Sequence, residues 1–147
     1  MPDSPQEPDV VPMHALSLSA AQRVVEAAIS AARSHGVAVC IVVSDPSGEP
    51  IVTARMDGAP RLSAEIARNK AYTVASFKGM PTDMWWPAIA DEPSLVHGIT
   101  HTPRLVIFAG GVPVHIDGAL VGAVGISGGS AEQDRSIAQA AAAAVGS

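Results

Sequence analysis

Two histidines, His97 and His101, are the residues of this 147-residue sequence best suited to metal chemistry. Their i, i+4 spacing would place both on one face of a helix, an arrangement that suits metal or haem ligation. Gly98 and Pro103 weaken the expectation of a helix there. No third ligand of obvious type accompanies the pair, so zinc is not expected, whereas haem iron needs only one or two axial ligands. The alternative is a pair of loop histidines hydrogen-bonded to backbone.

A glycine-rich turn with nearby charged residues forms a second candidate site. Backbone N–H groups in such a turn, just before a predicted helix, can hold an anion; a tight turn between strand and helix is the alternative. Lys70 interrupts an apolar helix flank, where it would hold a carboxylate or extend to water. Asp134 falls in the first turn of the last predicted helix, where the helix dipole alone favours a carboxylate. The turn comprises Ser127, Gly128, Gly129 and Ser130.

The composition excludes several classes of function. Hydrophobic residues make up 48% of the chain and charged residues 16%, which supports a packed core. A net charge of −5, with 9 scattered Lys and Arg, argues against nucleic-acid binding. The apolar run 37–43 is far shorter than the roughly 20 residues that cross a bilayer. Cys40, the single cysteine, lies in that run and is expected to be a buried, inert thiol.

The N-terminal stretch differs from the rest of the chain. Residues 1–12 are acidic and rich in proline, unlike the basic and then apolar layout of a signal peptide. We therefore expect a disordered leader over residues 1–15, a single domain over 16–147, and a cytoplasmic protein with no membrane partner.

Three helices and five strands are expected to position the candidate residues. Apolar residues at helical spacing predict a helix of about 16 residues that follows a capping box at Ser19–Gln22 and stops at Gly36. A second helix is predicted over about 62–77, and a third from a capping box at Ser130–Gln133 to about 145. Strands are predicted over 37–44, 49–56, 104–109, 112–116 and 119–126.

The segment between residues 80 and 103 is expected to be irregular, because four prolines interrupt it. It carries both tryptophans, Trp85 and Trp86, as well as the two candidate histidines. Long segments of this kind are more often functional than idle. The hairpins on either side predict an α+β fold in which a five-stranded antiparallel sheet is flanked by helices.

These motifs together resemble the GlcG/HbpS-like family, also called the haem-degrading domain family, whose domain also ends PduO-type corrinoid adenosyltransferases. The resemblance spans most of residues 16–145. It implies a profilin-like fold and homo-oligomers. The stretches that carry it are 18–32, Val42-Val43-Ser44-Asp45 with Gly48, Arg55-Met56-Asp57-Gly58-Ala59, Lys70-Ala71-Tyr72-Thr73, Gly110-Gly111-Val112-Pro113, Asp117-Gly118, and 121–129 with Glu132-Gln133-Asp134.

Two functions from different classes follow. The first is a haem-binding accessory or sensor protein without strong turnover, in which His97 or His101 ligates iron. Trp85 and Trp86 would stack on the porphyrin or, equally, be buried in a subunit contact. Arg55 or Lys70 would pair with a propionate.

The second is a cofactor-independent isomerase, tautomerase or hydratase that acts on a small carboxylate in a catabolic pathway. The 127–130 turn and Lys70 would bind the acid, while a histidine or Asp134 moves a proton. The two hypotheses differ in where His97 and His101 point: toward an apolar cleft with a tryptophan, or toward the glycine turn.

Overall fold

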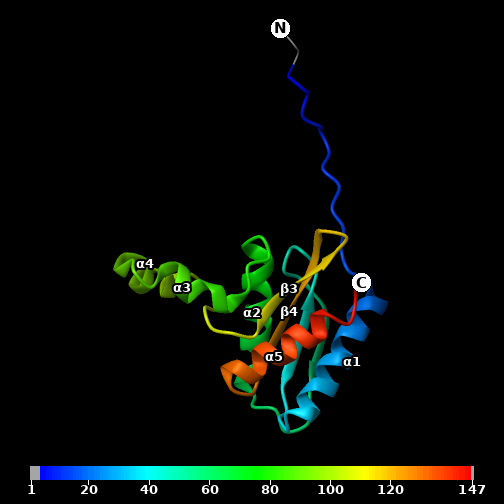
Figure 1. Ribbon diagram of the computed structural model, residues 1–147, viewed down its shortest axis with the longest axis vertical. Helices are drawn as coiled ribbons and strands as arrows, with labels where there is room; N and C mark the ends of the chain where they lie inside the picture. Colours follow the sequence, from blue (N-terminus) through cyan, green and yellow to red (C-terminus); the bar gives the residue numbers. More distant parts are fainter. Residues whose placement is uncertain (1–3, 147) are drawn as a thin grey trace.

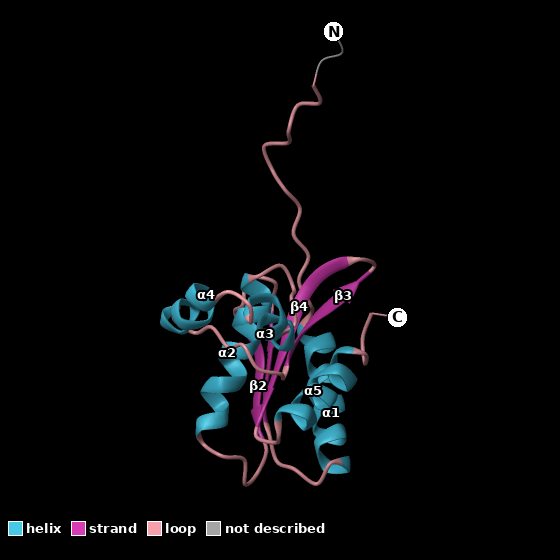
Figure 2. Cartoon of the chain, turned by 60° about the vertical axis from the view of Figure 1, so that its left-hand side comes forward, coloured by secondary structure: helices cyan, strands magenta, loops and turns pink. Residues whose placement is uncertain are grey.

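The computed structural model describes residues 4–146 as an antiparallel sheet with helices on both faces (Figures 1 and 2). The sheet has four strands in the order β2-β1-β4-β3. The central strands, β1 and β4, pair from Cys40 with Ser127 to Ser44 with Ala123. The strands are β1 (Cys40–Ser44), β2 (Pro50–Arg55), β3 (Gly111–Ile116) and β4 (Ala119–Ser127).

Helices α1 (Leu18–Ser34) and α5 (Ala131–Ala142) cover one face of the sheet, and α2 (Leu62–Ser76) covers the other. The larger core lies under α1 and α5 and contains Val24, Ile41, Val124 and Ile137. A smaller core lies under α2 and includes Val42, Ala71 and Val74. The three long helices thus confirm the predicted ones.

The segment after α2 forms an arm of short helices that extends from the side of the molecule (Figure 1). It consists of the 3₁₀ turn η1 (Thr82–Met84), α3 (Trp85–Ile89), α4 (Pro93–Gly98) and the 3₁₀ turn η2 (Ile99–His101). The buried hydroxyl of Thr82 accepts a hydrogen bond from the Gly111 N–H at 2.9 Å, which fastens the start of the arm to β3. The prediction of an irregular segment between residues 80 and 103 is therefore wrong in part, because the prolines break it into short helices.

The prediction of a strand over 104–109 is wrong. Arg104 has φ 66°, a left-handed conformation that no extended strand continues through. The Thr73 hydroxyl donates to the Arg104 carbonyl and accepts from the Val106 N–H, so these groups bond to a side chain of α2. The sheet consequently has four strands and not five.

The chain before α1 also corrects one prediction. The N-cap of α1 is Ser17, whose side chain accepts from the Ala20 N–H, and not Ser19. Residues 4–15 have exposed side chains and no helix or strand, whereas residues 1–3 of the predicted leader lie outside the described part of the chain. Within residues 4–146, no helix has the length and apolar character needed to cross a membrane.

Candidate functional site

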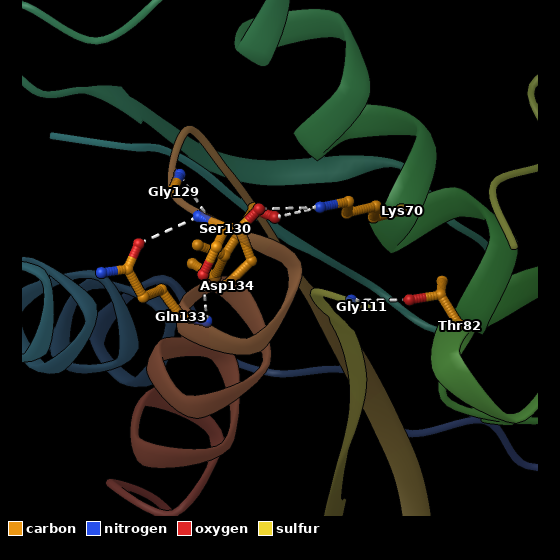
Figure 3. A network of polar contacts seen from close by, with 8 residues as sticks. Lys70, Thr82, Gly111, Gly129, Ser130, Gln133 and Asp134 are labelled. Atoms are coloured by element: carbon orange, nitrogen blue, oxygen red, sulfur yellow. Dashed lines mark hydrogen bonds and ion pairs between the residues drawn. The ribbon is translucent and has the colours of Figure 1, made fainter. Parts of the chain in front are cut away.

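Lys70 and Asp134 form a buried ion pair between α2 and α5 (Figure 3). Lys70 Nζ lies 3.2 Å from Asp134 Oδ2 and donates to the Ile126 carbonyl at 2.7 Å. The two residues are only 1% and 4% exposed. Of the two alternatives for Lys70, the one in which it extends to water is wrong, because the face of α2 that carries it packs against β4.

Burial dominates the electrostatics of this pair. Desolvation lowers the pKa of Lys70, although the Asp134 carboxylate opposes that shift. Desolvation also raises the pKa of Asp134, although Lys70 and the Gly129 N–H oppose it. Neither side chain lines any of the surface hollows described below. The pair joins α2 to α5, and its charges are directed at one another.

The glycine turn is closed by side chains of α5. The Gly129 N–H donates to Asp134 Oδ1 and the Ser130 N–H donates to Gln133 Oε1, both at 2.9 Å. The Ser130 hydroxyl accepts from the Gln133 N–H, which completes the predicted capping box (Figure 3). Two of the N–H groups expected to hold an anion thus already have partners within the chain, and Ser127 is buried in β4.

The two candidate histidines lie on the arm, away from the glycine turn. His97 is in the last turn of α4 and His101 ends η2, and both are exposed. The chain has five histidines and all of them are exposed, so accessibility does not distinguish these two. Among residues 4–146, no group of three or more His, Cys, Asp or Glu is placed to hold a metal ion.

The two tryptophans have different surroundings. Trp85 is 7% exposed and its ring lies 4.8 Å from that of Phe77, whereas Trp86 is 53% exposed. Trp85 lines an apolar hollow of about 270 Å³ whose other walls include Tyr72, Phe77, Ile99 and Leu105. Within the described part of the chain, the buried Trp85 Nε1 has no hydrogen-bond partner. Such an unsatisfied donor is uncommon in native proteins and calls for an explanation.

His101 is close in sequence to residues that line this hollow. Ile99 and Thr102, on either side of it, both line the hollow, as does Pro103. The arm therefore contributes residues on both sides of His101 to an apolar hollow that contains a tryptophan, although His97 and His101 do not themselves line it. Of the two arrangements that the sequence left open, the structure is closer to the one in which the histidines lie near an apolar cleft than to the one in which they face the glycine turn.

The structure also places Arg55, a predicted ligand-binding residue, in a hollow next to residues that the sequence did not single out as site residues. Arg68 and Arg104 line a hollow of about 560 Å³ on α2, and Arg55 lines an adjoining hollow of about 200 Å³ that shares Arg68. His14, expected only to be exposed, lines a further hollow of about 380 Å³ beside the β3–β4 hairpin. Both arrangements join segments distant in sequence, so residue spacing carries no signal for them.

Comparison with known proteins shows similarity over almost the whole domain. An uncharacterized 15.0 kDa protein of Citrobacter freundii is 38% identical over 86% of this chain and 89% of its own length. HbpS of Streptomyces reticuli, solved as a double mutant, is 32% identical with a TM-score of 0.83, covering 100% of this chain and 98% of that one. The solved PduOC:Heme complex is 36% identical with a TM-score of 0.82, covering 89% of this chain and 95% of that one.

One relative is much longer than this chain. The corrinoid adenosyltransferase PduO of Salmonella typhimurium is 34% identical over 96% of this chain, which spans only 42% of that protein. The sequence profile of the family described as "Haem degrading protein HbpS-like" matches residues 16–143. This chain, with its four-stranded sheet, buried Lys70–Asp134 pair and helical arm, belongs to the HbpS-like family.

Proposed function

We propose that this protein binds haem as an accessory or sensor protein without strong catalytic turnover. The observation that carries the proposal is the similarity to the PduOC:Heme complex, at 36% identity and a TM-score of 0.82. HbpS, a second neighbour of the same fold, supports the same ligand class through the description of its family.

The apolar hollow beside the arm fits part of a porphyrin. Its walls contain the rings of Tyr72, Phe77 and Trp85, which offer the flat apolar contact that a macrocycle needs. Trp85 Nε1, in the same wall, is buried without a hydrogen-bond partner among residues 4–146, so a bound acceptor would reach it only after the indole moves. Bound haem would supply an iron that takes an axial protein ligand.

His101 is the first candidate to hold the iron, because Ile99 and Thr102 on either side of it line the hollow. His97, four residues earlier in α4, is the second candidate. His14 is a third, since it lines a separate hollow with the apolar residues Ile116 and Val121. Each is exposed, so its imidazole is accessible to iron.

We expect a second copy of the chain to complete the site. A hollow of about 270 Å³ lies below the roughly 300–1,000 Å³ of pockets that enclose drug-sized molecules, so one subunit would leave most of a haem in water. Trp86 and Phe108, 53% and 51% exposed, line a shallow hollow where α5 meets the 104–110 segment. Exposed aromatic residues of this kind are typical of subunit contacts.

A haemin titration of the purified protein, followed by absorbance at the Soret band, tests the proposal. The wild type would be compared with His97→Ala, His101→Ala and His14→Ala, with His35→Ala as the matched control. We expect saturation near one haem per subunit or per dimer, and loss of the shifted Soret band in one of the first three variants only. A response that does not saturate in any protein would refute haem binding.

The acid–base alternative gains less from the geometry. Lys70 and Asp134 do meet, as that hypothesis requires, but they and the Gly129 N–H occupy one another's hydrogen-bonding positions. His97 and His101, which would move the proton, belong to the arm. We infer that the pair holds α5 against α2 rather than binding a substrate.

A further inference from the structure

A basic hollow of about 560 Å³ lies on the outer face of α2. Ala64, Glu65, Arg68 and Asn69 of α2 line it, together with Arg104 from the segment that follows the arm. Two arginines are notable here because the chain has only 9 Lys and Arg and a net charge of −5. Among residues 4–146, neither Arg68 nor Arg104 takes part in an ion pair.

Arg104 is held in place before any ligand arrives. Its guanidinium carbon lies 3.8 Å from the centroid of the Tyr72 ring, and its Nε donates to Asn69 Oδ1 at 3.1 Å. Because Nε is used, the terminal N–H groups are left to donate as a planar fork. Such a fork matches the two oxygens of a carboxylate.

The backbone of Arg104 is also fixed at an energetic cost. Its φ of 66° is uncommon for a residue other than glycine, and the buried Thr73 hydroxyl donates to its carbonyl at 3.1 Å. Residues held in sparsely populated conformations cluster at functional sites. Three side chains, Tyr72, Asn69 and Thr73, thus fix an arginine that is exposed to solvent, which favours a role in binding.

We propose that Arg68 and Arg104 form a carboxylate-binding subsite on α2. Arg104 supplies the oriented fork, while Arg68, which also lines the adjoining hollow with Arg55, supplies a second positive charge. Glu65 at the rim makes no ion pair with either arginine within residues 4–146, so both guanidinium groups are available to an added anion.

The carboxylate has two chemical sources. One is a small free organic acid that enters the hollow alone. The other is a propionate of haem, since Tyr72 lines the apolar hollow with one side and carries the Arg104 guanidinium on its ring. The second source rests on the proposed haem function, whereas the first does not.

The test uses the full chain and two sets of probes. Succinate and inorganic phosphate would be titrated by calorimetry, and haemin and its dimethyl ester by absorbance. The variants are Arg104→Gln, Arg68→Gln and the charge-retaining Arg104→Lys. Arg33→Gln, at an exposed position of α1, is the control of equal charge change. Circular dichroism and urea midpoints establish that each variant folds.

We expect Arg104→Gln and Arg68→Gln to bind one of the two carboxylate probes, succinate or haemin, about tenfold or more weakly than the wild type. Arg33→Gln should bind it with unchanged affinity. Arg104→Lys should restore only part of it, since lysine has no fork. Succinate binding with this pattern assigns a free acid. Haemin that binds more tightly than its ester, with the difference lost in Arg104→Gln, assigns a propionate.

Three results would overturn the subsite: equal binding of haemin and ester without succinate binding, an Arg104→Gln variant that behaves as the wild type, or phosphate bound more tightly than succinate. Failure of haemin to bind, with succinate binding intact, would refute the haem function and leave the subsite standing.

Discussion

Replacing Thr73 by valine should destabilise the protein because it removes one buried hydroxyl group. Thr73 is 1% exposed, and its Oγ1 donates to the Arg104 carbonyl at 3.1 Å and accepts from the Val106 N–H at 3.0 Å. Valine has almost the same shape, so packing is retained while both hydrogen bonds are lost. The 104–106 segment has no strand partner to replace them, because it lies outside the sheet.

The expected loss follows from the burial of these groups. A typical hydrogen bond contributes about 1 kcal/mol net, and an orphaned buried donor costs about 1–3 kcal/mol. Val106 is 7% exposed, so its N–H would be left without water. We expect the free energy of unfolding to fall by about 2–3 kcal/mol. At about 2–4 °C per kcal/mol for a chain of this size, Tm should fall by roughly 4–12 °C.

Urea unfolding followed by tryptophan fluorescence measures this loss, because Trp85 is buried against Phe77. The midpoint should fall while the slope m stays constant. Thr73→Ser is the matched control: it keeps the hydroxyl and loses one methyl group, which costs about 1 kcal/mol. A Thr73→Val variant within about 0.5 kcal/mol of the wild type, or a Thr73→Ser variant equally destabilised, would refute this reasoning.

Three further perturbations test other parts of the fold. Gly125→Ala should prevent folding or cost more than about 3 kcal/mol, because its Cβ would overlap the Ala67 carbonyl oxygen. Gly118→Ala, whose Cβ meets nothing within 4 Å, should cost only about 1 kcal/mol from its φ of 79°. Ser130→Ala should lower the free energy of unfolding by about 1 kcal/mol through loss of the α5 cap, measured by urea unfolding. Lys70→Met should cost about 3–5 kcal/mol at pH 7. Without Lys70, burial raises the pKa of Asp134 further, so ionising this carboxyl costs the folded state more stability. The difference in free energy of unfolding between variant and wild type should therefore grow as pH rises from about 4 to 7. A difference that shrinks over this range would contradict the assignment.

Local signals in the sequence predicted most of the fold. Helical periodicity located α1, α2 and α5, and the Ser130–Gln133 capping box located the start of α5 to the residue. The Asp117-Gly118 turn located the β3–β4 hairpin. In each case the residues that decide the structure lie within a few positions of one another, so the sequence contains the whole interaction.

The two local errors have non-local causes. The run 104–109 has the composition of a strand, but Thr73 in α2 takes up its polar backbone groups. For α1, Ser17 and Ser19 both lie near the start of the helix, and Ser17 becomes the cap where the Leu16 N–H bonds to the Val121 carbonyl of β4. A distant element therefore chose between two local solutions of similar propensity.

The candidate site was less predictable than the fold, because side-chain type does not reveal which way a helix faces. Lys70 lies on the buried face of α2, while Arg68, two residues earlier, is exposed at the basic hollow. The sequence alone does not tell which of these two cations faces a ligand site. Only the folded chain, which brings Arg104 beside Arg68, shows that two positive charges meet on the outer face of α2.

Gly110 and Gly125 explain why no substrate fits between α2 and the sheet. An added Cβ at Gly125 would collide with the backbone of α2, and one at Gly110 would lie 2.5 Å from Lys70 Nζ. The glycine pattern therefore lets α2 lie directly on β4, and the ion pair fills the small space that remains between α2 and α5. An interface packed this closely has no room for a substrate. The subsite proposed above lies instead where α2 faces away from the sheet, beside Tyr72, Arg68 and Arg104.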